Sequence, residues 1–156
     1  MRALVAWAAV LAGCALGNPA LEDEPLDDAA FRCRVESILA RRCAFPACHG
    51  DPARPFRVYA PNRLRYGLPA DALPSPLTPE EHDANLRAAT SFAGPSAGYA
   101  EPLLVAKPLS ERLGGAYHGG AEQFGAGDVF EAPDDPDLAA LRVWVAGAAE
   151  EPSCAR

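Results

Sequence analysis

Two cysteines and a histidine lie within seven residues in the first third of the chain. Cys43 and Cys48 are separated by four residues, and His49 follows directly, before Gly50. Two thiols can each form a covalent bond, and an adjacent imidazole can ligate a metal ion. The fold must therefore hold these groups around a shared ligand or around a disulfide between the two cysteines.

The segment resembles the attachment site of a c-type haem. The usual signal is Cys-x-x-Cys-His, and here the spacer between the cysteines has four residues. A longer spacer requires only a wider loop between the two attachment points. The resemblance implies that Cys43 and Cys48 form thioethers with the haem vinyl groups and that His49 is the proximal iron ligand.

The N-terminus resembles the signal peptide of a bacterial lipoprotein. A short positive start precedes an apolar stretch, 3–16, whose 14 residues are too few to span a membrane, which takes about 18. The sequence Leu-Ala-Gly-Cys at 11–14 resembles a lipobox. We expect residues 1–13 to be cleaved, Cys14 to carry lipid, and residues 14–26 to form a flexible tether. An ordinary signal peptide with a chance cysteine is the alternative.

Export places the protein in the bacterial cell envelope. Ala15 follows the lipidated cysteine in place of aspartate, which by analogy favours sorting to the outer membrane. We expect a domain that faces the periplasm, held to the membrane by its lipid anchor.

The five cysteines can all be assigned in such a compartment. Cys14 would carry lipid, and Cys43 and Cys48 would carry haem. Cys33 and Cys154 then remain, near the two ends of the domain, to form a disulfide. In the alternative assignment Cys43 pairs with Cys48 as well, and no haem is bound.

Length and charge restrict the partners. The formal net charge is −7, and an acidic protein is a poor candidate for binding nucleic acid. It could dock a basic redox partner protein. About 140 residues remain after cleavage, enough for one domain with a core, which we place at 27–156.

Three helices are predicted. The first runs from an Asp27-Asp28 cap to about Arg42 and leads directly into the first cysteine of the motif. The second opens with a Thr-x-x-Glu capping box at 78–81 and reaches about residue 89, and the third runs from a cap at 134–135 to about residue 148. The apolar stripes of the first and third are Phe31, Val35, Ile38 and Leu39, and Leu138, Leu141, Trp144, Val145 and Ala148.

Between the last two helices, a Leu-Leu-x-x-Lys-Pro segment at 103–108 is followed by Gly-Gly-x-x-His-x-Gly at 114–120. These glycines form no nucleotide-binding fingerprint. Together with the cysteine motif and the last helix, the arrangement resembles small cytochrome-c-like domains of bacterial lipoproteins over residues 31–148. The resemblance implies an all-α fold whose N- and C-terminal helices cross, with long irregular loops around one haem.

The sixth iron ligand has few candidates. The mature chain contains no methionine, so His82 and His118 are the remaining nitrogen donors. We expect His118, because its flanking glycines let the backbone approach a flat cofactor closely. His82 lies in the second predicted helix at a position typical of a solvated face. An open or water-filled sixth position is the alternative.

Four arginines follow the motif, at positions 54, 57, 63 and 65. Arg54 and Arg57 are the candidate partners of the haem propionates, because a guanidinium group binds carboxylates through two hydrogen bonds. Solvated surface arginines are the alternative interpretation for all four.

We therefore expect a lipid-anchored monohaem electron carrier and not an enzyme. The main alternative is a haem-free, disulfide-stabilised lipoprotein module that binds a protein or a polysaccharide. A zinc site made of Cys43, Cys48, His49 and His118 would strain the adjacent Cys–His pair. A hydrolase built from Ser110, His118 and Asp128 lacks a nucleophile elbow motif.

Overall fold

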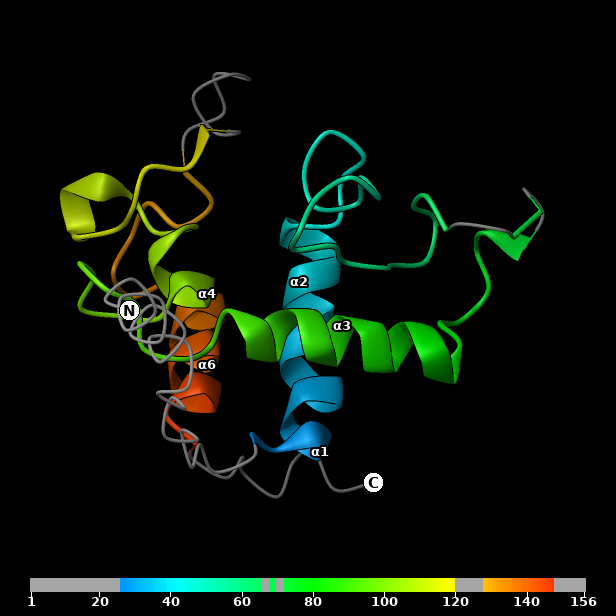
Figure 1. Ribbon diagram of the computed structural model, residues 1–156, viewed down its shortest axis with the longest axis horizontal. Coiled ribbons are helices and arrows are strands. Elements are labelled where there is room, and N and C mark those ends of the chain that lie inside the picture. The colour runs from blue at the N-terminus through cyan, green and yellow to red at the C-terminus, as the bar shows by residue number, and fades with distance from the viewer. Residues whose placement is uncertain (1–25, 66–67, 70–71, 120–127, 148–156) are drawn as a thin grey trace, which may run out of the picture.

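The structure is a computed structural model, and it describes residues 26–65, 68–69, 72–119 and 128–147. In these ranges the regular elements are helices, and the β-type pairing is limited to an isolated bridge between Leu109 and Phe130 (Figure 1). The predicted all-α class is therefore confirmed.

The first predicted helix is present from Asp28 to Arg42. It consists of α1 (Asp28–Ala30), a π-helical turn η2 (Phe31–Val35) and α2 (Glu36–Arg42). The Asp27 side chain caps it by accepting a hydrogen bond from the backbone N–H of Ala30 at 3.0 Å. The π turn was not predicted, because an apolar spacing of three and four residues does not distinguish it from α-helix.

The second predicted helix is α3 (Pro79–Ser91). Its capping box is complete, because the Thr78 side chain accepts from the Glu81 backbone and the Glu81 side chain accepts from the Thr78 backbone. In Figure 1, α3 crosses the line of α2 at a steep angle.

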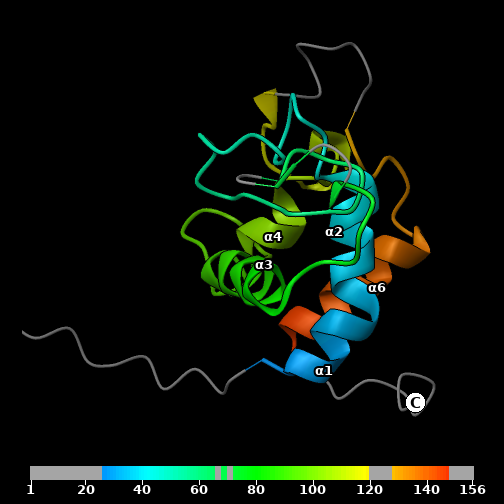
Figure 2. The ribbon, with the colours of Figure 1, turned by 90° about the vertical axis from the view of Figure 1, so that its right-hand side faces the viewer.

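The third predicted helix is α6 (Pro136–Val145), capped by the Asp135 side chain. It packs against the first helix, as expected: the rings of Trp144 and Phe31 lie 5.3 Å apart between centroids. The indole Nε1 of Trp144 donates to the Asp27 carbonyl oxygen at 2.9 Å. Figure 2 shows α6 running obliquely against α1 and α2.

Two short helices were not predicted, α4 (Leu103–Ala106) and η4 (Glu111–Leu113). Both are too short to show a periodic apolar pattern. α4 packs on α6 and buries Leu104 and Val105, so it extends the core between the first and last helices toward the loops. The largest buried apolar side chains of the core are Trp144, Phe31, Phe130, Ile38, Leu39, Leu109, Leu138 and Leu141.

Several predictions fall outside the described residues. The signal peptide at 1–13, Cys14 and nearly all of the tether lie there, as does Cys154. Cys33 lies on the exposed side of η2, and its pairing with Cys154 stays a prediction. Among the described residues, no helix is both long enough and apolar enough to span a bilayer.

Candidate functional site

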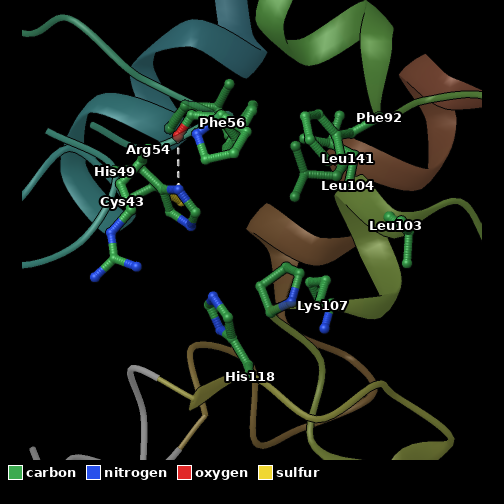
Figure 3. Close-up of a pocket in the computed structure, with 13 residues that line it drawn as sticks. Cys43, His49, Arg54, Phe56, Phe92, Leu103, Leu104, Lys107, His118 and Leu141 are labelled. Atoms are coloured by element: carbon green, nitrogen blue, oxygen red, sulfur yellow. Dashed lines mark hydrogen bonds between the residues drawn. The ribbon is translucent and has the colours of Figure 1, made fainter. Parts of the chain in front are cut away.

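A pocket of about 390 Å³ lies where the cysteine motif, the end of α3, α4 and α6 meet (Figure 3). This volume is within the roughly 300–1,000 Å³ typical of sites for small molecules and cofactors. The lining is mostly apolar, and its titratable groups come from the motif and from the loop after α4. The lining residues are Leu39, Cys43, His49, Arg54, Pro55, Phe56, Phe92, Leu103, Leu104, Lys107, Pro108, His118 and Leu141.

The cysteine motif folds into a compact loop at the end of α2. The backbone N–H of His49 donates to the Cys43 carbonyl oxygen at 3.0 Å, and that of Gly50 donates to the Phe45 carbonyl oxygen at 3.0 Å. A Cβ atom at Gly50 would lie 2.5 Å from the carbonyl oxygen of Ala44, so this turn needs glycine. The four-residue spacer therefore closes with Cys43 and His49 on the wall of the pocket.

The imidazole of His49 is oriented by a hydrogen bond. Its Nδ1 atom lies 2.7 Å from the Phe56 carbonyl oxygen, and because a carbonyl only accepts, Nδ1 must donate. Nε2 is then the unprotonated nitrogen, as in many metal-ligating histidines. Burial lowers the pKa of His49 against the opposing effect of this hydrogen bond, and the nearby His118 and Arg54 lower it further. The ring is thus neutral and available as a ligand.

The imidazole of His118 projects into the same pocket from the loop after η4 (Figure 3). Its ring centroid lies 5.8 Å from that of His49, and the two ring planes are 16° from parallel. Burial lowers the pKa of His118, and the nearby Lys107 ammonium lowers it further, against a smaller opposite effect of Asp128. Its Nδ1 atom is buried and has no hydrogen-bond partner among the residues that the structure describes.

The two histidines bring imidazole nitrogens to one pocket. Their rings form a stacked pair with 5.8 Å between centroids, and the Nδ1 atom of His49 is bonded to the Phe56 carbonyl oxygen, which leaves Nε2 as its donor to a metal. Apolar side chains of α2, α4 and α6 form the adjoining wall, which suits a large apolar ring system. These residues therefore fit a haem group.

The two cysteines differ in their surroundings. Cys43 lines the pocket, and burial raises the pKa of its thiol to about 12. Its sulfur is therefore protonated at neutral pH, a poor state for ligating a metal as thiolate. Cys48 is half-buried beside the pocket and not among its lining residues. The two thiols are free and not bonded to each other.

Two alternatives do not match this geometry. Across the described ranges, no three histidine, cysteine, aspartate or glutamate side chains gather closely enough to hold one ion, whereas a structural zinc ion needs about four ligands. For the hydrolase, the Ser110 hydroxyl accepts from the Arg112 guanidinium at 3.4 Å, and in the described part of the chain no hydrogen bond joins it to Nδ1 of His118.

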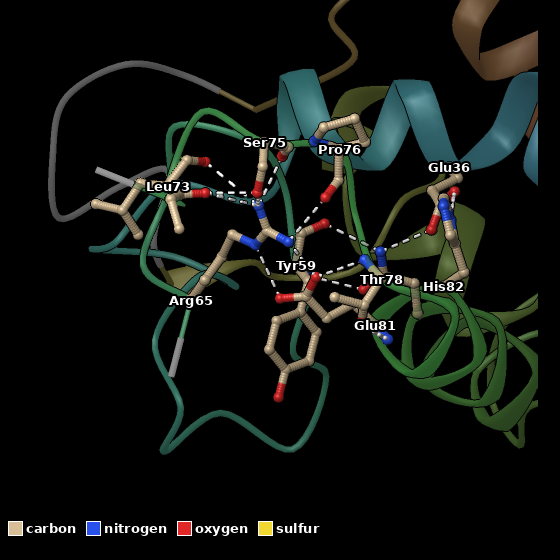
Figure 4. Close-up of polar contacts among 11 residues, drawn as sticks. Glu36, Tyr59, Arg65, Leu73, Ser75, Pro76, Thr78, Glu81 and His82 are labelled. Atoms are coloured by element: carbon tan, nitrogen blue, oxygen red, sulfur yellow. Dashed lines mark hydrogen bonds and ion pairs between the residues drawn. The ribbon is translucent and has the colours of Figure 1, made fainter. Parts of the chain in front are cut away.

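The arginines separate into different environments. Arg54 is exposed and lines the mouth of the pocket. Arg57 is half-buried and lies outside the lining of the pocket. Its guanidinium stacks over the Tyr59 ring at 4.1 Å, and its Nε and Nη2 atoms are buried without hydrogen-bond partners among the described residues. The interpretation of Arg65 as a solvated surface arginine is wrong, because its side chain is buried against Glu81 (Figure 4).

The position of His82 in the helix predicted a solvated face, and this prediction is wrong. Its Nδ1 atom lies 2.6 Å from a carboxylate oxygen of Glu36, whose other oxygen accepts from Asn85 at 2.8 Å (Figure 4). The Asn85 amide also exchanges two hydrogen bonds with the Tyr59 backbone. His82 thus takes part in a polar cluster between α2 and α3, away from the pocket.

Sequence reasoning missed one polar residue of the site. Lys107 lines the pocket beside His118, and it is the only lysine in a chain with 13 arginines. The presence of a single lysine among so many arginines was the sequence feature that could have indicated a special role for Lys107. Most of the apolar wall was also missed, because the residues that form it come from five separate segments.

Comparisons with protein-family models, with curated proteins and with solved structures find no match to this chain. The function of the chain is therefore inferred from the residues of the site.

Proposed function

We propose that this protein transfers electrons through one covalently bound haem. The observation that carries the proposal is the pair of neutral imidazoles, His49 and His118, that face each other at 5.8 Å in an apolar pocket. His49 would be the proximal ligand, since its Nδ1–H is already committed to the Phe56 carbonyl. His118 would be the distal ligand.

The cysteines would supply the covalent attachment. Each thiol would add across one vinyl double bond of the haem: the sulfur bonds one carbon, and the thiol proton passes to the other. Nothing leaves in this addition, and no oxidant is needed. Cys43 presents its protonated thiol at the pocket wall, and Cys48 is the second thiol of the same loop.

The chemistry supplied by such a group is one-electron transfer at iron. Two histidine ligands give a lower potential than a histidine and a methionine. With both axial positions filled, the site would pass electrons to a partner protein and do little chemistry on small molecules, so we propose a carrier and not an enzyme. The exposed Arg54 at the mouth remains the best placed candidate for a propionate contact.

The remaining parts of the proposal concern location. A lipid on Cys14 would hold the domain at the envelope membrane, with a redox partner protein within reach of the tether. These features depend on the sequence of residues 1–26.

The test is expression of the mature domain with a cytochrome c maturation system, followed by visible spectroscopy under denaturing conditions and intact-mass measurement. We expect haem that stays attached after denaturation. The Cys43→Ala/Cys48→Ala double variant should lose the covalent attachment, whereas Arg87→Met, which changes an exposed side chain outside the pocket, should retain it. A colourless protein with a Cys43–Cys48 disulfide would overturn the proposal and favour the haem-free binding module.

A further inference from the structure

The two imidazoles are held in different ways. The ring of His49 is oriented by its own Nδ1 hydrogen bond to the Phe56 carbonyl. The Nδ1 atom of His118 has no partner, although it is buried. Among the described residues no hydrogen bond orients this nitrogen of His118, so the position of the ring depends on its stacking against His49 and on the backbone that carries it.

Two hydrogen bonds, together called the clasp, join that backbone to the end of α4. The ammonium Nζ of Lys107 donates to the Tyr117 carbonyl oxygen at 2.7 Å, and the Ala116 N–H donates to the Ala106 carbonyl oxygen at 2.7 Å. These two hydrogen bonds come from consecutive residues at the helix end and hold consecutive residues of the loop. His118 is the next residue in the chain.

The backbone just before the clasp, at Gly115, is also closely packed. A Cβ atom at Gly115 would lie 1.8 Å from the Leu109 carbonyl oxygen, so the chain is pressed against the segment after α4 immediately before Ala116. Ala116 is buried, whereas Tyr117 is exposed. The Lys107 contact is therefore the outermost fixed point before the histidine.

We propose that Lys107 is the positioning residue of His118: its ammonium fixes the Tyr117 carbonyl and thereby aims the imidazole at His49. This inference rests on the proposed function for its purpose, but the clasp itself is independent of haem. The ammonium charge also favours the neutral imidazole, since it lowers the pKa of His118. A compact ammonium at the end of a flexible stem suits a single carbonyl oxygen better than a planar guanidinium does.

The test compares Lys107→Met with Arg87→Met, which removes an exposed cation of α3 that does not line the pocket. Hydrogen exchange followed by mass spectrometry would report on the loop at 114–118. We expect roughly tenfold faster exchange there in Lys107→Met, since a hydrogen bond from a charged donor is lost. Arg87→Met should leave the loop unchanged.

A second readout separates positioning from general stability. In haem-loaded protein, Lys107→Met should bind added cyanide roughly tenfold faster than the parent, because the sixth ligand is released more often, while the thermal midpoint changes little. Unchanged exchange and unchanged cyanide binding would overturn the inference. Faster exchange in a protein that takes up no haem would support the clasp and refute the proposed function.

Discussion

The imidazoles of His49 and His118 lie nearly parallel, 16° apart, with 5.8 Å between their centroids. One comes from the loop that ends α2, and the other lies 69 residues later, in the loop that follows η4. Neither ring donates to or accepts from the other. Two rings at this separation form a stacked pair, and both line the same apolar pocket.

Replacing His118 should change the spin state or the midpoint potential of the haem, depending on the side chain that is introduced. His118→Ala removes the distal nitrogen, and we expect the spectrum of the oxidised protein to change from low-spin to high-spin. His118→Met substitutes the ligand that raises haem potentials, and we expect a higher midpoint potential in a redox titration. His82→Ala is the control, because His82 faces Glu36. A low-spin spectrum in His118→Ala would contradict this ligand assignment.

Acid should destabilise the site. Burial lowers the pKa of both His49 and His118 below the usual value of about 6.5. Below about pH 6.5 the unfolded chain binds protons at these two histidines that the folded protein does not bind. Their contribution to the free energy of unfolding is therefore fully present above about pH 6.5, and it is lost as the pH falls below that value. Binding of a metal ion by these imidazoles should also weaken as the pH falls, because a ligating imidazole must be neutral.

Denaturant unfolding at pH 7.5 and pH 5.5 would measure this effect. The midpoint should be lower at pH 5.5, and His118→Phe should reduce the difference because one of the two groups is gone. Equal midpoints at the two pH values in the parent protein would contradict the predicted neutral state of the imidazoles.

The parts of the fold that the sequence predicted are those with local signals. Asp27, Thr78 and Asp135 each cap a helix at the predicted place, because a side-chain oxygen at a helix start makes a contact within three residues. The contact of Trp144 with Phe31 followed from two apolar stripes and the family resemblance.

The parts that were missed depend on distant contacts. The positions of Arg65 and His82 in the chain indicate nothing of their carboxylate partners, which lie 16 and 46 residues away. Similarly, the motif could predict a histidine ligand but not its hydrogen bond to Phe56, since the return of the chain at 56–58 is set by tertiary packing.

Gly115 should be intolerant of any side chain. A Cβ atom there would lie 1.8 Å from the Leu109 carbonyl oxygen, and the clash is with backbone, which cannot rotate away. We expect Gly115→Ala to lower the free energy of unfolding by about 1–3 kcal/mol, the usual range for overpacking, and to disturb the loop of His118. Gly94→Ala is the matched control, since no atom lies within 4 Å of a Cβ at that position. Equal stability of the two variants in denaturant would show that the loop relaxes.

The pair of Arg65 and Glu81 should be the most costly ion pair to break. The Arg65 side chain is 0% exposed, and it donates to Glu81 and to the carbonyl oxygens of Ser75 and Pro76 (Figure 4). This contact also lowers the pKa of Glu81, whose carboxylate completes the α3 capping box. The guanidinium therefore ties the loop before α3 to the start of that helix.

We expect Arg65→Met to reduce the free energy of unfolding by about 3 kcal/mol, because it leaves a carboxylate and two carbonyls without their donor. The surface pair of Arg112 and Glu131 provides the control: its arginine side chain is 75% exposed, so Arg112→Met should cost less than about 1 kcal/mol. Adding Glu81→Gln to Arg65→Met should recover part of the loss, since the unpaired charge is then removed. If urea unfolding gave the same loss for Arg65→Met and Arg112→Met, the buried pair would not be holding the loop to α3.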